Sequence, residues 1–359
     1  MPAMQLRQAW DVFCRVIDNH GDVGVAWRLC ADLAARGERV RLWLDNAAAL
    51  AWMAPQGQAG VELVSWTEPV PDLAPGDVVI ETFGCDPPPR FVQRMTEQTP
   101  APVWINLEYL SAEAYVERSH GLPSPPNLGH GRTMEKWFFY PGFSTRTGGL
   151  LREPGLMADR QAFDREAWLH ETGIDTQPGE RRVSLFCYDN PALPGLLDTL
   201  GDAPTRLLVT PGAPSALVRA LLGPTLRQGA LRAVLLPYLT QTGYDRLLWA
   251  SDLNFVRGED SFVRAQWAGK PFVWQAYPQA GKAHRAKVHA FLDRMLSGAG
   301  EATATSLRAL WNGWNELAAM PACLPAAEPW RHHCERWRDE LLAQPDLTTQ
   351  LVRFAGKRR

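Results

Sequence analysis

Two carboxylates, Asp18 and Asp22, lie in a short loop that joins an apolar segment to a segment with helical periodicity. A dinucleotide-binding turn carries Gly-x-Gly-x-x-Gly, so that backbone amides can approach a pyrophosphate. This loop has only Gly21 and Gly24, and its two acidic side chains would repel a phosphate group. Carboxylates at a helix N-terminus suit a cationic or proton-donating acceptor instead. The alternative is that Asp22 only caps a helix that starts at Val23.

A second group of polar residues follows the apolar segment 253–256. Asp260 or Ser261 would begin a helix whose free amides could bind a diphosphate, with Arg257 adding a positive charge. Glu259 could bind ribose or sugar hydroxyls. The alternative is a simple helix cap in which Arg257 and Glu259 are solvated charges.

Aromatic residues follow two other apolar segments in the second half of the chain, namely Phe186, Tyr188 and Tyr238. An aromatic ring at the end of a strand can stack on a nucleobase. The amide of Gln241 can read the hydrogen-bonding edge of such a base. We therefore expect a nucleotide-binding edge here. For Phe186 the residues favour a core position near a domain interface instead.

Metal and nucleophile chemistry have little support in the sequence. No Asp-x-Asp motif for a divalent cation occurs, and the group His332, His333 and Cys334 lacks the spacing of zinc ligands. No Gly-x-Ser-x-Gly elbow is present either. We therefore predict a metal-independent reaction that needs no cofactor and forms no covalent serine or cysteine intermediate.

Length and composition indicate an ordinary globular protein. A chain of 359 residues is long enough for two domains, and its net charge of −2 gives no broad attraction to nucleic acid or anionic membranes. No apolar segment reaches the roughly 18 to 20 residues that span a bilayer. The six cysteines form no Cys-x-x-Cys pair, which favours reduced thiols. We expect a cytoplasmic protein without nucleic-acid or membrane partners.

The first half of the chain reads as a series of strand–helix–strand units. Segment 12–17 is apolar and β-branched, helical spacing continues until Gly37, and 40–44 reads as the next strand. Further short apolar runs cover 61–64, 77–80 and 103–106. Carboxyl ends of parallel strands share one sheet edge, so the polar residues in 81–86 and 106–110 should lie beside the acidic loop. From 107 to about 150 the helical pattern disappears.

The second half repeats this organisation. Apolar runs at 183–187, 206–209, 233–236 and 253–256 alternate with helical patterns near 191–200, 214–222, 243–250 and 261–268. A possible helix covers 160–172, and the chain from 303 onward reads as helical throughout. The predicted fold is α/β, with two Rossmann-like domains facing each other across a cleft. We assign 1–155 to an acceptor-side domain, 156–182 to a crossing segment, 183–340 to a nucleotide-sugar domain and 341–359 to a C-terminal helical tail.

Four of these segments in this order resemble the EarP family, the protein-arginine rhamnosyltransferases of bacterial elongation factor P. They are Asp18-Asn19-His20-Gly21-Asp22-Val23-Gly24, Asn106-Leu107-Glu108-Tyr109-Leu110-Ser111, Phe186-Cys187-Tyr188 and Arg257-Gly258-Glu259-Asp260-Ser261-Phe262. Each motif alone is weak, but the set is specific when combined with the chain length and the doubled strand–helix pattern. The likeness covers nearly the whole chain.

The resemblance implies a GT-B glycosyltransferase that uses dTDP-β-L-rhamnose as co-substrate, inverts the anomeric carbon and needs no metal. It implies elongation factor P as the protein acceptor. Asp22 would be the general base or acceptor-orienting carboxylate, supported by Asp18. The implied donor-binding residues are Asn19 and Gly21 near the rhamnose, Phe186, Tyr188, Tyr238 and Gln241 around the thymidine, Arg257, Asp260 and Ser261 at the diphosphate, and Glu259 at the sugar or phosphate end.

Two other functions stay open from the sequence. A GT-B enzyme with another nucleotide sugar or acceptor would share these motifs. A non-catalytic nucleotide-binding module would share the fold, but such a module has no need of carboxylates that face a donor.

Overall fold

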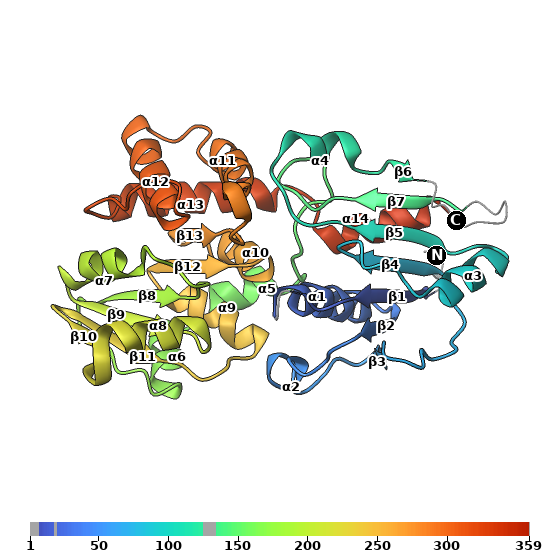
Figure 1. The fold of residues 1–359 in the computed structure, drawn as a ribbon, viewed down its shortest axis with the longest axis horizontal. Helices are drawn as coiled ribbons and strands as arrows, with labels where there is room; N and C mark the ends of the chain where they lie inside the picture. Colours follow the sequence, from blue (N-terminus) through green and yellow to red (C-terminus); the bar gives the residue numbers. More distant parts are fainter. Residues whose placement is uncertain (1–6, 18–19, 125–133, 359) are drawn as a thin grey trace. The chain divides into compact units, whose positions relative to one another are not determined.

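The structure is a computed structural model that describes residues 7–17, 20–124 and 134–358. The chain divides into two compact units (Figure 1). Unit 1 consists of Met1–Glu153 and Gln344–Arg359, and unit 2 consists of Pro154–Ala343. The predicted boundary at 155 differs from this division by two residues. The predicted crossing segment 156–182 lies in unit 2, and most of the predicted tail 341–359 lies in unit 1.

Unit 1 contains one sheet with the strand order β3-β2-β1-β4-β5-β7-β6. All pairings in it are parallel except that of β6 with β7. The strands are β1 (Ala9–Cys14), β2 (Arg39–Leu44), β3 (Val61–Ser65), β4 (Val78–Thr82), β5 (Val103–Leu107), β6 (Pro123–Ser124) and β7 (Lys136–Phe139). The helices are α1 (Gly21–Ala35), α2 (Leu50–Met53), α3 (Pro89–Glu97), α4 (Ala114–Ser119) and α14 (Leu347–Gly356).

The predicted strand–loop–helix unit at the start of the chain is present with shifted ends. Trp10, Val12 and Cys14 of β1 lie in one core cluster with apolar residues of α1 that include Leu29 and Leu33. Helix α1 ends before Gly37, whose φ of 96° lies in the left-handed region that glycine favours. The prediction that the strand continues to residue 17 was wrong. Pairing with β2 stops at Cys14, and Ile17 is 77% exposed.

Segment 107–150 contains more structure than its sequence suggests. Helix α4 lies within it, and β7 extends the sheet beside β5. The short run that forms β7 begins with Lys136, whose ammonium group donates to the buried Glu81 carboxylate on β4 at 2.7 Å. A lysine at a strand position hides the apolar periodicity, which is why the sequence did not reveal this strand.

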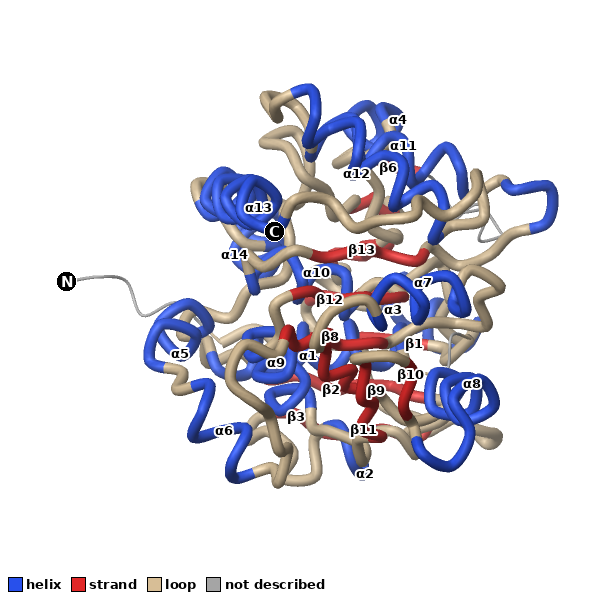
Figure 2. Tube along the Cα trace, turned by 90° about the vertical axis from the view of Figure 1, so that its left-hand side faces the viewer, coloured by secondary structure: helices blue, strands red, loops and turns tan. Residues whose placement is uncertain are grey.

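Unit 2 contains the second sheet, with the order β10-β11-β9-β8-β12-β13 and parallel pairing except between β10 and β11. The strands are β8 (Arg181–Leu185), β9 (Thr205–Val209), β10 (Arg227–Gln228), β11 (Leu231–Leu235), β12 (Leu253–Arg257) and β13 (Phe272–Gln275). The helices are α5 (Leu156–Ala162), α6 (Arg165–Glu171), α7 (Leu193–Gly201), α8 (Ala213–Leu222), α9 (Gln241–Ala250), α10 (Asp260–Ala268), α11 (His284–Met295), α12 (Glu301–Trp314) and α13 (Ala327–Leu342), with short 3-10 helices at Gly223–Thr225 and Ala280–Lys282. Figure 2 shows helices on both sides of these strands.

Two helical predictions in unit 2 need correction. The predicted helix over 160–172 is two helices, because the Asp164 side chain accepts the N–H of Ala167 at 3.0 Å and so starts α6 as a new helix. The chain after 303 is not helical throughout, since 315–326 lies between α12 and α13. Pro321 and Pro325 in this segment lack the N–H that a continuous helix requires.

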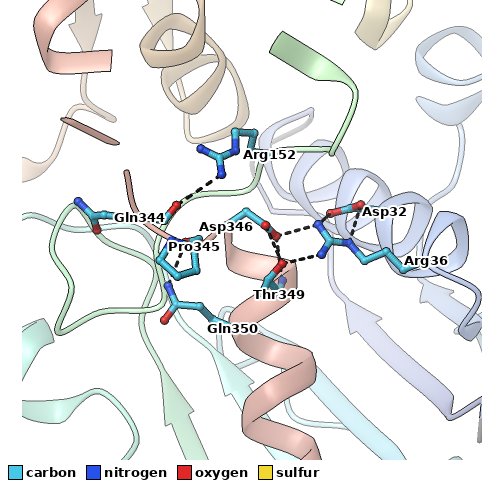
Figure 3. Close-up of polar contacts among 8 residues, drawn as sticks. All are labelled: Asp32, Arg36, Arg152, Gln344, Pro345, Asp346, Thr349 and Gln350. Atoms are coloured by element: carbon cyan, nitrogen blue, oxygen red, sulfur yellow. Dashed lines mark hydrogen bonds and ion pairs between the residues drawn. The ribbon is translucent and has the colours of Figure 1, made fainter. Parts of the chain in front are cut away.

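Polar contacts attach the C-terminal helix α14 to unit 1 (Figure 3). Asp346 caps α14 by accepting the N–H of Thr349 at 2.8 Å, and it also accepts from Arg36 of α1 at 2.8 Å. The same guanidinium bonds Asp32 at 2.9 Å with two of its nitrogens. Leu347 and Leu351 enter the core cluster that contains β1 and α1. Helix α14 is therefore part of the scaffold that supports the acidic loop.

Candidate active site

Asp22 lies in the first turn of α1, and its carboxylate closes the preceding loop. The helix begins at Gly21, and its Asp22 side chain is only 4% exposed. Its Oδ2 accepts the backbone N–H of Ile17 at 2.9 Å. Helix amides at an N-terminus favour a negative charge at this position. Asp18 and Asn19 lie outside the described residues.

The capping alternative for Asp22 was wrong in its details. The helix starts two residues before Val23, with His20 as the residue that precedes it. Asp22 is thus inside the helix, and its Oδ2 accepts the N–H of Ile17 in the loop that follows β1. The hydrogen bond fixes the carboxylate at the carboxyl edge of the unit 1 sheet.

The ends of β4 and β5 share this edge, as predicted. The Thr82 hydroxyl and the Cys85 thiol both donate to the carbonyl of Phe13 in β1, at 2.9 and 3.3 Å. The backbone N–H of Gly84 donates to Asn106 Oδ1 at 3.1 Å. The polar residues after β4 and β5 are therefore tied to one another and to β1, on the same side as the Asp22 loop.

In unit 2, Arg257 at the end of β12 lies against two aromatic rings. Its guanidinium carbon is 4.5 Å from the ring centre of Phe186 and 4.1 Å from that of Tyr188. Such cation–π contacts hold the planar group in a defined orientation. The alternatives of a solvated Arg257 and of a core position for Phe186 do not describe this arrangement, because both side chains are half-buried at the sheet edge.

The first turns of α9 and α10 lie side by side next to Arg257. Asp260 is the first residue of α10, and its carboxylate accepts the side-chain amide of Gln241, the first residue of α9, at 3.4 Å. The Ser261 hydroxyl donates to the carbonyl of Arg257. Glu259 directly precedes α10 and is half-buried. The predicted helix start at Asp260 is confirmed.

Tyr238 occupies a more open position than the other predicted aromatic residues. It lies in the loop between β11 and α9 and is 53% exposed. Its ring is therefore accessible to a planar ligand, whereas Phe186 and Tyr188 are half-buried.

The sequence analysis missed the contribution of β13 to this edge. Gln275, the last residue of β13, accepts the backbone N–H of Tyr188 at 2.9 Å. Tyr277 follows two residues later, is 61% exposed, and packs edge-on to Tyr188 with ring centres 5.2 Å apart. The signal that would have identified this strand is the short apolar run 272–274, which is followed by the polar Gln275 and the aromatic Tyr277.

Among the described residues, no group of three or more histidine, cysteine, aspartate or glutamate side chains could hold a metal ion. His333 instead bonds the Met295 carbonyl at 2.8 Å and accepts from Arg336 at 3.1 Å. No helix within these residues is both long and apolar enough to cross a membrane.

Comparisons with known proteins agree with the motifs and the fold. The family model described as "Elongation-Factor P (EF-P) rhamnosyltransferase EarP" matches residues 10–356. The protein-arginine rhamnosyltransferase of Pseudomonas aeruginosa is 43% identical over 373 residues, which cover 96% of this chain and 98% of that protein. The corresponding enzyme of Neisseria meningitidis serogroup B is 34% identical and covers 96% of both chains.

Solved structures give the fold. A structure described as the basis for EarP-mediated arginine glycosylation of translation elongation factor EF-P matches with a TM-score of 0.70 and 33% identity, covering 98% of this chain and 99% of that chain. The glycosyltransferase SnogD from Streptomyces nogalater matches with a TM-score of 0.54 and 16% identity, covering 97% and 100%. The two Rossmann-like sheets thus form a GT-B glycosyltransferase fold. On the family match and these identities, the chain belongs to the EarP family of elongation factor P rhamnosyltransferases.

Proposed function

We propose that this protein transfers L-rhamnose from dTDP-β-L-rhamnose to an arginine of translation elongation factor P, with inversion at the anomeric carbon and without a metal ion. The observation that carries the proposal is the match of residues 10–356 to the EarP family model. Support comes from a buried carboxylate in unit 1 and from the arrangement of Arg257, its two rings and the start of α10 in unit 2.

The high pKa of the acceptor arginine limits how Asp22 can act as a base. An arginine side chain has a pKa above about 12, so Asp22 cannot remove its proton before the reaction. Asp22 instead pairs with the guanidinium and directs one nitrogen at the anomeric carbon. The nitrogen forms its bond to C1 while the C1–O bond to the diphosphate breaks, and Asp22 takes the proton from that nitrogen. The electron pair of the broken bond leaves on dTDP.

The leaving diphosphate requires positive charge and hydrogen-bond donors. Arg257 offers the charge, and its contacts with Phe186 and Tyr188 orient the guanidinium plane. The backbone amides at the start of α10 offer donors where negative charge develops. Tyr238, Tyr188 and Gln241 supply rings and an amide for the thymidine, and Glu259 binds the sugar or phosphate end of the donor.

Intact-mass spectrometry tests the proposal. Purified elongation factor P is incubated with this protein and dTDP-β-L-rhamnose, and we expect a gain equal to one deoxyhexose, which peptide mapping places on an arginine. A parallel reaction with UDP-glucose in place of dTDP-rhamnose tests the identity of the donor. A second reaction that contains EDTA tests whether transfer needs a metal ion. An unchanged mass with dTDP-rhamnose refutes the proposed donor or acceptor, and a gain that EDTA abolishes refutes metal independence.

We expect that Glu259→Ala weakens donor binding by about tenfold, because it removes a half-buried acceptor of hydrogen bonds beside the start of α10. Isothermal titration calorimetry with dTDP-β-L-rhamnose measures the affinity. Glu328→Gln, which changes an exposed carboxylate in the first turn of α13, is the charge control and should bind as the wild type does. Wild-type donor affinity in Glu259→Ala would show that this side chain does not contact the donor.

A further inference from the structure

Glu108 and Tyr140 stand side by side at the carboxyl edge of the unit 1 sheet. The parallel strands β5 and β7 end with the paired residues Leu107 and Phe139, so Glu108 and Tyr140 are the next pair in register. The backbone N–H of Glu108 donates to the Phe139 carbonyl at 3.0 Å and fixes this alignment. Their side chains therefore leave the two strands in the same direction.

The Glu108 carboxylate is held by neutral partners. Asn106 donates its side-chain amide to Glu108 Oε1 at 2.8 Å, and Asn106 is itself fixed by the N–H of Gly84 at 3.1 Å. Burial raises the pKa of Glu108, although the hydrogen bond from Asn106, a backbone hydrogen bond from Tyr109 and the positive charge of Lys136 oppose this effect. Within the described part of the chain, none of the ion pairs includes Glu108. A half-buried carboxylate in this setting favours an added cation.

Two tyrosine rings border this carboxylate. Tyr115 of α4 packs edge-on to Tyr140 with ring centres 5.8 Å apart. Burial raises the pKa of both phenols, and the charge of Glu108 adds to this effect, after that of Glu113 in the case of Tyr115; the pKa of Tyr140 is raised to about 12. Tyr115 is 41% exposed, so the group of Glu108, Tyr115 and Tyr140 can be reached from solvent.

We propose that Glu108, Tyr115 and Tyr140 bind the guanidinium of the acceptor arginine, an inference that rests on the function proposed above. A planar cation with several N–H donors can pair with the carboxylate and place its face on a ring, which an ammonium group does less well. The site also lies at the same sheet edge as Asp22. Strands β1 and β5 are separated in the sheet only by β4, so their ends lie about 10 Å apart, at roughly 4.8 Å per strand. Glu108 directly follows β5, and Asp22 lies in the first turn of the helix that follows β1, so both carboxylates belong to this edge.

This shared edge suits one substrate that reaches both groups. Two carboxylates that belong to the same sheet edge can pair with different nitrogens of one guanidinium. Glu108 would then hold the arginine while Asp22 pairs with the nitrogen that reacts. Glu108 is thus a binding residue, and the proton transfer stays with Asp22.

A double-mutant cycle tests the inference. The four affinities are those of wild-type protein and Glu108→Gln for elongation factor P and for its variant in which the modified arginine is alanine. We expect Glu108→Gln to weaken binding of the natural acceptor about tenfold and binding of the alanine variant less than twofold. Equal losses for both acceptors, or no loss for either, would overturn the assignment.

Two controls sharpen this result. Glu135→Gln removes an exposed carboxylate just before β7, at the opposite end of that strand, and should leave both affinities unchanged. Tyr115→Leu should weaken acceptor binding about threefold while Tyr115→Phe retains it, because the ring face provides the contact. Equal affinities for the Leu and Phe variants would remove Tyr115 from the site. Rhamnose transfer by the wild-type protein is measured separately by intact-mass spectrometry. A failure of the proposed function is therefore recognised independently of these affinities.

Discussion

Asp22→Asn should lower the rate of rhamnose transfer by at least about 1,000-fold, because the amide cannot take the proton that the arginine nitrogen releases. The asparagine side-chain oxygen can still accept the Ile17 N–H, so the loop should keep its conformation. The groups proposed to bind dTDP lie in unit 2, so dTDP affinity should stay within about twofold. Rates are measured by mass spectrometry of the acceptor and affinity by calorimetry.

A matched control is available in the same loop region. Asp45 also accepts a backbone N–H from this segment, that of Val16 at 3.0 Å, but it is exposed. Asp45→Asn should therefore transfer rhamnose at close to the wild-type rate. If Asp22→Asn kept a rate within tenfold of wild type, Asp22 would be only a structural tie for the loop.

Asp245→Ala should destabilise unit 2 by about 3 to 5 kcal/mol, because it leaves the buried Arg264 without its carboxylate. Two guanidinium nitrogens of Arg264 bond the two oxygens of Asp245 at 2.8 Å each, and both side chains are at most 5% exposed. The pair joins α9 to α10, whose first residues are Gln241 and Asp260. The change should therefore also weaken dTDP binding.

Urea denaturation followed by tryptophan fluorescence measures the first effect. Glu335→Gln is the control, since the exposed pair Arg331–Glu335 on α13 should contribute less than about 0.5 kcal/mol. Replacing both partners, as in Asp245→Leu with Arg264→Met, should recover most of the stability, because no buried charge is then left unpaired. A destabilisation below about 1 kcal/mol in Asp245→Ala would contradict this account.

Local sequence patterns predicted the elements that carry the predicted site residues. The apolar run at 253–256 followed by Asp260 became β12 and α10, and the run at 103–106 became β5. These predictions succeeded because a buried strand and a helix start each depend on neighbouring residues. Element ends were less certain. Ile17 is apolar enough to continue β1, yet its partner strand β2 has already ended at Leu44.

The residues that gather around Arg257 in unit 2 were only partly visible in the sequence. The motif around Arg257 indicated a charged helix start, but not that Phe186, Tyr188 and Gln275 would converge there from three other positions. Residues 70 to 90 positions apart meet only when β8, β12 and β13 align in the sheet. No local pattern encodes that alignment, since it depends on long-range packing.

By itself the sequence determined the order of the strands and helices along most of the chain, the acidic first turn of α1 and the family motifs. Tertiary structure decided which residues share an edge. It added β7 beside β5, which places Tyr140 next to Glu108, and it returned α14 to unit 1 through Asp346 and Arg36. The physical reason is the distance along the chain over which each kind of contact acts. Periodicity reports the environment of a segment over a few residues, whereas strand order and the docking of a terminal helix depend on contacts between segments far apart in the chain.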